Sequence, residues 1–294
     1  MRLLESPRVL FWVPTLIWAS TWHVILYQLA ESPPLNAVGW RFLLAGGVLL
    51  GVAVARGEHW QLPLRWHGWL ALTGSVQYSV NYWGVYEAER HVPSGLVAVL
   101  FSLMVFGNAL LGWWLFKQPV TRRFLVAAVC GVAGVVLIFW PEVVAAGARP
   151  NAGLGLGVGL LAVLMACIGN ALTLLLTRRG VPLLPLLGWS MTYGALVLLA
   201  IAGAQGSLAQ IGHSAAWWVS LLYLSLFGTV VAFFVYFRLA QRVGPARAAM
   251  TGVMIPPIAL AISAALEGWR PTLLSLAGVL LCLGSVFVAT RRKA

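Results

Sequence analysis

The chain has 294 residues, of which 61% are apolar and only 9% are charged, and its mean hydropathy is +0.91. A soluble domain carries about 25% charged residues, so this composition excludes a soluble globular protein and indicates an integral membrane protein. The net charge of +12 would also be compatible with binding to nucleic acid. The positions of the basic residues along the chain favour another explanation of this charge.

Apolar runs recur along the whole chain. A helix needs about 20 apolar residues to cross about 30 Å of hydrocarbon, which leaves room for ten crossings. The first run is too long for a signal peptide and has no small-residue cleavage site behind it, so we expect a retained helix. We predict an all-α polytopic membrane protein with ten transmembrane helices, at residues 9–29, 35–55, 68–88, 95–116, 124–140, 153–176, 183–204, 216–239, 246–266 and 273–290.

The basic residues predict the orientation of these helices. Three of the 19 Lys and Arg residues fall in loops of one side, namely Arg90, Arg149 and Arg270, and Arg41 lies inside the second span. The other fifteen fall on the opposite side: Arg2, Arg8, Arg56, Arg65, Lys117, Arg122, Arg123, Arg178, Arg179, Arg238, Arg242, Arg247, Arg291, Arg292 and Lys293. The positive-inside rule therefore places both termini in the cytoplasm. The basic excess is a topology signal, and phosphate binding is the weaker reading of it.

The first span carries Trp18, Trp22 and His23 near its middle. Indole rings at that depth can form the walls of a cavity and make cation-π contacts to an ammonium group; the alternative is an interfacial aromatic belt. His23 is the histidine that falls within a predicted span, so it is the candidate there for titration near neutral pH. A neutral imidazole bonded to a neighbouring helix is the favoured reading over a proton carrier.

The second span contains Arg41, whose burial costs about 2.5–3.5 kcal/mol at the centre of a membrane helix. It needs a partner or water, and Glu87, Glu89 and Glu31 are the candidate partners at the outer ends of the neighbouring spans. We expect a structural clamp or an outer-gate latch. Direct binding of a substrate carboxylate is the second interpretation.

The third span gathers hydrogen-bonding side chains within an apolar segment. Tyr78, Asn81 and Tyr82 follow the spacing of one helical face, and Gln77 borders that face one turn before Asn81. Polar groups that faced lipid would be costly, so we predict that this face lines a hydrated pathway. The alternative is that these side chains only bond neighbouring helices.

The second half offers fewer polar groups. We expect Asn170 of the sixth span and Thr229 of the eighth span to line the same pathway. The ninth span contains Pro256 and Pro257, and proline kinks a helix and frees a carbonyl group. These prolines are therefore candidates for a hinge, with packing as the alternative.

The second half of the chain also resembles the first. The pattern P-x5-GW at Pro33 to Trp40 recurs at Pro182 to Trp189, and Pro119 matches Pro271. The offset drifts only from 149 to 152, which predicts two five-helix repeats at residues 1–148 and 149–294. Because five is odd, the second repeat enters the membrane from the opposite side. Such inverted repeats surround the central site of many secondary transporters.

Several motifs, in this order, resemble those of a known family. They are "WRF" (Trp40 to Phe42), "VPSGLVAVL" (Val92 to Leu100), "GVAGVVLI" (Gly131 to Ile138), "GPARAAM" (Gly244 to Met250) and "GVLLCLGSVFV" (Gly278 to Val288). The chain is similar to the EamA-type carriers of the drug/metabolite transporter superfamily, and most like the bacterial amino-acid exporters. The resemblance implies ten helices, with a central cavity among helices 1, 3, 4, 6, 8 and 9.

The absence of several sequence motifs argues against other functions, such as ATP-driven pumping or hydrolysis. No ATP-binding P-loop, HExxH zinc motif or G-x-S-x-G nucleophile occurs, which disfavours a pump, a protease or an esterase. The three cysteines, Cys130, Cys167 and Cys282, match no metal-ligand spacing. No Asp occurs, and no Glu is expected deep in a span, which disfavours a carboxylate proton relay.

From the resemblance, which implies the direction of transport, we predict an inner-membrane exporter of amino acids or related small metabolites, working by alternating access as a uniporter. The alternatives are a multidrug or quaternary-amine exporter, with or without proton coupling, and more remotely a membrane-embedded enzyme on a lipid-linked substrate. The expected partners are a small-molecule substrate and the lipid bilayer. We expect no cofactor, no metal, no nucleic acid and no catalytic residue, and we expect a monomer.

Overall fold

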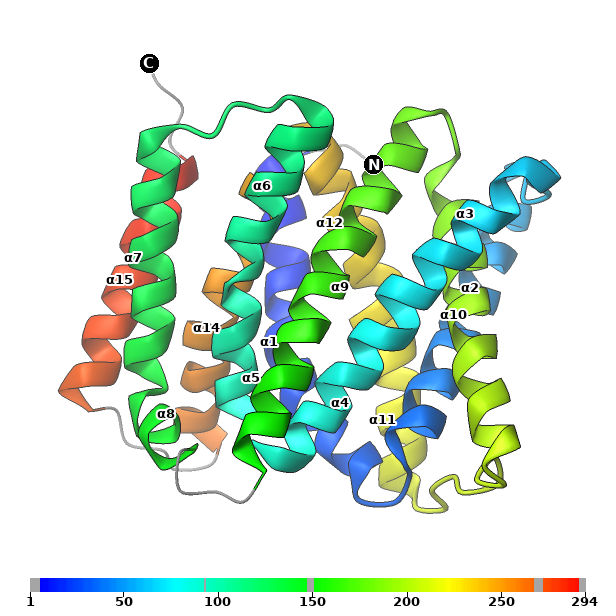
Figure 1. The fold of residues 1–294 in the computed structure, drawn as a ribbon, viewed down its shortest axis with the longest axis horizontal. Helices are drawn as coiled ribbons and strands as arrows, with labels where there is room; N and C mark the ends of the chain where they lie inside the picture. The colour runs from blue at the N-terminus through cyan, green and yellow to red at the C-terminus, as the bar shows by residue number, and fades with distance from the viewer. Residues whose placement is uncertain (1–5, 93, 147–150, 267–271, 291–294) are drawn as a thin grey trace.

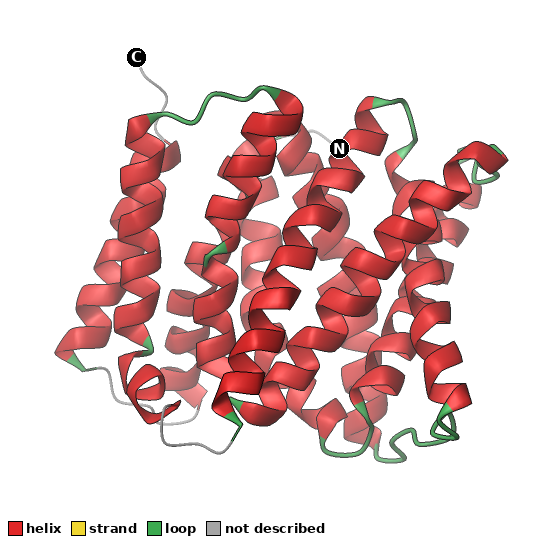
Figure 2. Cartoon of the chain, viewed as in Figure 1, coloured by secondary structure: helices red, strands yellow, loops and turns green. Residues whose placement is uncertain are grey.

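The computed structural model describes residues 6–92, 94–146, 151–266 and 272–290. Within these ranges the chain is helical and contains no strand (Figure 2). The helices run between two edges of the molecule, where the loops gather, and the first described helix begins at the same edge at which the last described helix ends (Figure 1). The predicted boundary between repeats, at residues 148 and 149, lies outside the described residues. So do Arg2, Arg149, Arg270, Arg291, Arg292 and Lys293, as well as Pro271.

The helices of the first half cover the first five predicted spans, except that the last of them begins only where the fifth span ends. They are α1 (Pro7–Leu29), α2 (Pro34–Ala55), α3 (Leu64–Gly74), the π-helix η2 (Ser75–Val80), α4 (Asn81–His91), α5 (Ser94–Ser102), α6 (Met104–Phe116), α7 (Arg122–Ile138) and α8 (Trp140–Ala146). The third span is therefore interrupted by a π-helical turn, and the fourth is divided at Leu103. Proline at the first position of α1 and α2 has no amide hydrogen to leave unpaired there.

The second half follows with α9 (Ala152–Arg178), α10 (Leu183–Ala204), α11 (Ala215–Ser225), the π-helix η3 (Leu226–Val231), α12 (Ala232–Val243), α13 (Pro245–Ala248), α14 (Thr251–Leu266) and α15 (Leu273–Thr290). The eighth predicted span again contains a π-helical turn. The two π-helices begin 151 residues apart, at Ser75 and Leu226. This separation agrees with the offset of the predicted repeat.

Six helical segments of the described chain are long and apolar enough to cross a membrane. They are Pro7–Leu29, Pro34–Ala55, Val97–Phe116, Ala152–Arg178, Leu183–Ala204 and Ala215–Val243, while Leu273–Ala289 is apolar but shorter. The structure is thus that of a polytopic membrane protein. The count of ten crossings and the inverted repeat remain predictions.

Helix pairs from the two halves pack along each other. The α2 helix lies on α10, α7 on α15, α4 on α9 and α1 on α12. Glycines permit the close approach of α3 and η2 to α10: a Cβ atom at Gly74 would lie 2.2 Å from the carbonyl oxygen of Ser190, and one at Gly194 would lie 2.6 Å from that of Gly74. The pairs α2·α10 and α7·α15 join helices that the predicted repeat relates to each other, whereas α4·α9 and α1·α12 join different predicted spans. A cavity lies among helices of the two halves.

Candidate functional site

A cavity of about 120 Å³ lies among helices of both halves. Its walls are aromatic and apolar, with a few polar side chains and one charged side chain among the described residues. The lining comprises Trp18, Thr21, Trp22, Ile25, Arg41, Gln77, Asn81, Tyr82, Val85, Ala98, Phe101, Met104, Ala166, Asn170, Phe233, Tyr236, Ala249, Thr251, Gly252, Ile255 and Pro256. Predicted spans 1, 3, 4, 6, 8 and 9, which the resemblance places around a central cavity, all contribute lining residues. Arg41 contributes from the second span as well.

Only part of the polar face predicted for the third span lines the cavity. Gln77, Asn81 and Tyr82 line the cavity, whereas Tyr78 does not. The Tyr78 ring is fully buried against the rings of Phe42 and Phe233, at centroid distances of 5.1 and 5.4 Å. These rings from α2 and α12 cover Tyr78, so it belongs to the packed core behind the cavity wall. Helical spacing alone did not reveal this.

A chain of amides crosses the cavity wall. The amide nitrogen of Gln77 donates to Oδ1 of Asn170 at 3.3 Å, and the amide nitrogen of Asn170 is 3.3 Å from Oδ1 of Asn108 and 3.4 Å from the Tyr236 hydroxyl. The chain therefore joins η2, α9, α6 and α12. We had not predicted a role for Asn108. An amide within the apolar run "FGNALLGWW" was the signal, under the same rule that selected Asn81.

Three buried polar atoms of the cavity lining have no hydrogen-bond partner among the described residues. They are Nε1 of Trp22, Oε1 of Gln77 and Oδ1 of Asn81. The Asn81 oxygen is left over because its amide nitrogen donates to the backbone carbonyl of Gln77 at 3.1 Å. Oε1 of Gln77 lies against Gly169 of α9. Buried polar groups are nearly always paired, so the Trp22 donor and the Asn81 acceptor are the candidate partners for a polar ligand.

Arg41 is 1% exposed, and its hydrogen bonds go to neutral groups. Its Nε donates to Oγ1 of Thr229 at 2.9 Å, Nη1 lies 3.4 Å from the Tyr86 hydroxyl, and Nη2 lies 3.4 Å from the carbonyl oxygen of Gly228. The guanidinium also lies over the Tyr82 ring, 4.9 Å from its centroid. Thr229 is fully buried and lies outside the cavity lining. Its observed contact is therefore with Arg41.

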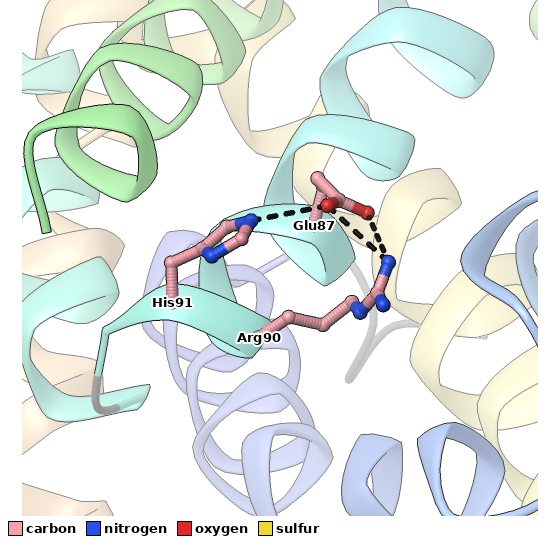
Figure 3. A network of polar contacts seen from close by, with 3 residues as sticks. All are labelled: Glu87, Arg90 and His91. Atoms are coloured by element: carbon pink, nitrogen blue, oxygen red, sulfur yellow. Dashed lines mark hydrogen bonds and ion pairs between the residues drawn. The ribbon is translucent and has the colours of Figure 1, made fainter. Parts of the chain in front are cut away.

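Glu87 does not pair with Arg41, the partner that the sequence suggested, but with two residues of its own helix. Its carboxylate lies 3.1 Å from Arg90 and 3.2 Å from Nε2 of His91, both one turn further along α4 (Figure 3). The Glu31 carboxylate accepts hydrogen bonds from the Ser214 side chain and from the backbone amides of His213 and Ser214. Neither carboxylate is hydrogen-bonded to Arg41.

Glu89 lies near the end of α4, at the end of the third span where the sequence placed it, but its carboxylate is buried. Both of its carboxylate oxygens are buried near the end of α4 and have no hydrogen-bond partner among the described residues. The sequence argument against a carboxylate proton relay therefore does not extend to Glu89.

Some of the remaining predicted residues line the cavity, and others lie outside it. Trp18 and Pro256 line the cavity, and Trp18 donates its indole N–H to the carbonyl oxygen of Gly228 at 3.0 Å. Pro257 is buried beside Pro256 inside α14. His23 is exposed on α1, with its ring 5.6 Å from that of Tyr27, and does not line the cavity. His23 therefore lies on the exposed side of α1, outside the cavity.

The described residues contain no cluster of three or more His, Cys, Asp or Glu side chains that would hold a metal. Within the same ranges, Cys130, Cys167 and Cys282 are free thiols. The chemistry available in the cavity is therefore binding through hydrogen bonds, one cation and aromatic rings.

Comparison with known proteins identifies the family. The model of the EamA-like transporter family matches residues 8–140 and 156–291. Protein PecM of Dickeya dadantii (strain 3937) is 29% identical over 255 residues, covering 85% of this chain and 80% of that protein. The "Uncharacterized inner membrane transporter YedA" of Escherichia coli (strain K12) is 29% identical over 259 residues, covering 86% of this chain and 80% of YedA.

A solved crystal structure has the same fold. It aligns with a TM-score of 0.79 at 16% identity, and the alignment covers 97% of this chain and 96% of the other. At this identity the match shows the likeness of fold alone. The family match spans most of the chain and both of its halves. With its cavity and its apolar helices, this membrane protein belongs to the EamA-like transporter family, within the drug/metabolite transporter superfamily.

Proposed function

We propose that the chain exports amino acids or related small metabolites across an inner membrane, by alternating access and as a uniporter. The observation that carries the proposal is the cavity between the two halves, whose lining includes an unpartnered donor on Trp22 and an unpartnered acceptor on Asn81. A donor and an acceptor suit a small polar solute. Because these atoms are neutral, they bind such a solute loosely enough to release it.

The size of the cavity supports a small substrate. Its volume of about 120 Å³ is below the roughly 300–1,000 Å³ of pockets that take drug-sized ligands. A single small metabolite is therefore a better match than a large drug. The walls come from both halves, so rocking of one half against the other would open the cavity to alternate sides.

The second candidate is a quaternary-amine exporter. The observation in its favour is the aromatic lining, to which Trp18, Trp22, Tyr82, Phe233 and Tyr236 contribute. Aromatic faces attract such cations. The buried cation of Arg41 in the same lining opposes this candidate, because like charges repel in a site of low dielectric constant.

The test is counterflow in proteoliposomes with a panel of labelled amino acids. We expect counterflow for at least one amino acid, independent of an imposed pH gradient. We expect Asn81→Ala to lower the rate about 10-fold, the equivalent of about 1.4 kcal/mol for a lost hydrogen bond and its orientation. The matched control is Tyr78→Phe, which removes a polar atom from the same span outside the cavity lining. We expect it to transport at the wild-type rate.

Three outcomes would contradict the proposal in different ways. Counterflow of tetraphenylphosphonium with none of any amino acid would favour the quaternary-amine exporter. Uptake that depends on a pH gradient in the wild type but not in Glu89→Gln would replace the uniporter with a proton-coupled carrier. Unchanged transport in Asn81→Ala would move the binding site away from the third span.

A further inference from the structure

Arg41 is the charged side chain in the described cavity lining, and it is positioned there by neutral groups. It is 1% exposed on α2, and Thr229, Tyr86 and Gly228 accept from it. A charge at this depth is retained only where it has water, a counter-ion or a function. The identity of the missing counter-charge is therefore the question that Arg41 raises.

The carboxylates of the described chain do not supply it. Glu87 is paired with Arg90 and His91, and Glu31 is bonded to the start of α11. The buried oxygens of Glu89 have no hydrogen-bond partner among the described residues, Arg41 included. Within the described residues, Arg41 forms no salt bridge.

The guanidinium also has donors to spare. It carries five N–H groups in a planar fork, and the hydrogen bonds to Thr229, Tyr86 and Gly228 use three of them. The two long contacts, each 3.4 Å, are weaker than the short bond to Thr229, which fixes the orientation of the side chain. A planar fork with free donors is the geometry that binds a carboxylate.

A neighbouring unpartnered atom complements an amino group. Oδ1 of Asn81 can only accept hydrogen bonds, and Asn81 lines the same cavity as Arg41. Its orientation is fixed because the amide nitrogen of Asn81 donates to the backbone carbonyl of Gln77. The cavity thus offers a cationic donor for an acid and a neutral acceptor for an amine.

The geometry points to Arg41 as the residue that binds the carboxylate of the substrate, with Asn81 accepting from its ammonium group. This inference rests on the proposed function and narrows it: the substrate is a zwitterionic α-amino acid, and compounds without the acid are excluded. The substrate carboxylate then supplies the counter-charge that Arg41 lacks, while the net charge of the cavity is unchanged because the substrate itself is neutral overall.

The experiment compares each amino acid with its amide, which keeps the ammonium group and the side chain but has no carboxylate. Binding of alanine, leucine and phenylalanine and of their three amides to the purified protein in detergent is measured by isothermal titration calorimetry. For the wild type we expect each amino acid that binds to do so at least about 10-fold more tightly than its amide, as for hydrogen bonds to a charged group. This comparison does not depend on the folding of any variant.

The variant Arg41→Gln tests the residue itself. We expect the ratio of the two dissociation constants to fall to about 1 in this variant, because the carboxylate then has no cation to bind. The matched control is Arg56→Gln, which makes the same change at the exposed end of α2 and is expected to keep the wild-type ratio.

The outcomes separate this inference from the proposed function. Counterflow of an amino acid whose amide binds the wild type equally well would overturn the role of Arg41 and leave the transport proposal standing. A ratio in Arg41→Gln that equals the wild-type ratio would do the same. Absence of binding and counterflow for every amino acid would overturn the proposed function, and this inference with it.

Discussion

The indole of Trp18 on α1 donates to the backbone carbonyl oxygen of Gly228 in η3, at 3.0 Å and across 210 residues of sequence. Arg41 approaches the same oxygen at 3.4 Å. The π-helical turn thus presents one carbonyl to two side chains from the first half. This contact fixes α1 against the eighth predicted span at the wall of the cavity.

We expect Trp18→Phe to lower the free energy of unfolding by about 1 kcal/mol, the typical net value of one hydrogen bond. The phenyl ring keeps most of the contacts with the Phe233 and Tyr236 rings, which lie 5.3 Å from the indole. Thermal unfolding in detergent is the measurement. The matched control is Trp12→Phe at an exposed position of the same helix, and an equal loss in both variants would refute the assignment.

The hydroxyl of Tyr78 is buried and has no partner among the described residues. Burying a hydroxyl without a hydrogen bond costs free energy, so Tyr78→Phe should raise the unfolding temperature while the ring packing stays in place. The same thermal unfolding assay measures this. A lower unfolding temperature would mean that the hydroxyl has a partner, such as a buried water.

Gly74 lies where α3 meets α10. A Cβ atom there would lie 2.2 Å from the carbonyl oxygen of Ser190 and 2.9 Å from the backbone nitrogen of Gly194. Because both obstacles are backbone atoms, Gly74→Ala must separate the helices, and we expect a loss of about 1–3 kcal/mol from overpacking.

Gly68 on the same helix serves as the control for Gly74. A Cβ atom at Gly68 would meet nothing within 4 Å, and alanine is favoured over glycine inside a helix by about 0.5–1 kcal/mol. Gly68→Ala should therefore keep or raise the unfolding temperature. Equal destabilisation of the two variants would show that the close approach at Gly74 is not the cause.

The hydrogen bonds to the Glu31 carboxylate lead us to expect that the stability of the protein depends on pH. Hydrogen bonds from the Ser214 side chain, from the Ser214 backbone amide and from the His213 backbone amide lower the pKa of this carboxyl. Since the pKa is lower in the folded state, the stabilisation is complete above the ordinary pKa of about 4.3. It is lost as the pH falls through the folded-state pKa.

The corresponding measurement is the unfolding temperature of the wild type and of Glu31→Gln between pH 7 and pH 3. We expect the variant to be less stable at pH 7 and the difference to shrink toward the acid end. Ser214→Ala should show the same trend, because it removes the first of these donors and the cap that accepts from the Trp217 amide. A difference that does not change with pH would contradict the role of the carboxylate charge.

Several features of the site follow from the sequence alone. The depth of Arg41 within an apolar run predicted a buried cation, and Gln77, Asn81 and Tyr82 were predicted to line a pathway because polar groups avoid lipid. Trp18 and Trp22 were expected in the same wall from their depth in the first span. Each of these predictions needs only the position of one residue along one helix, which the length of an apolar run and its helical period determine.

Tertiary structure decided which of these side chains reach the cavity. Tyr78 has the spacing of the lining face but is covered by Phe42 and Phe233, which come from helices distant in sequence. His23 lies on the exposed side of α1, and Thr229 lies behind the wall and bonds Arg41. Contacts between helices, and the two π-helical turns that rotate the faces of their spans, depend on neighbours that no local pattern specifies. The helices were thus determined by apolar periodicity, whereas the cavity was determined by how they pack.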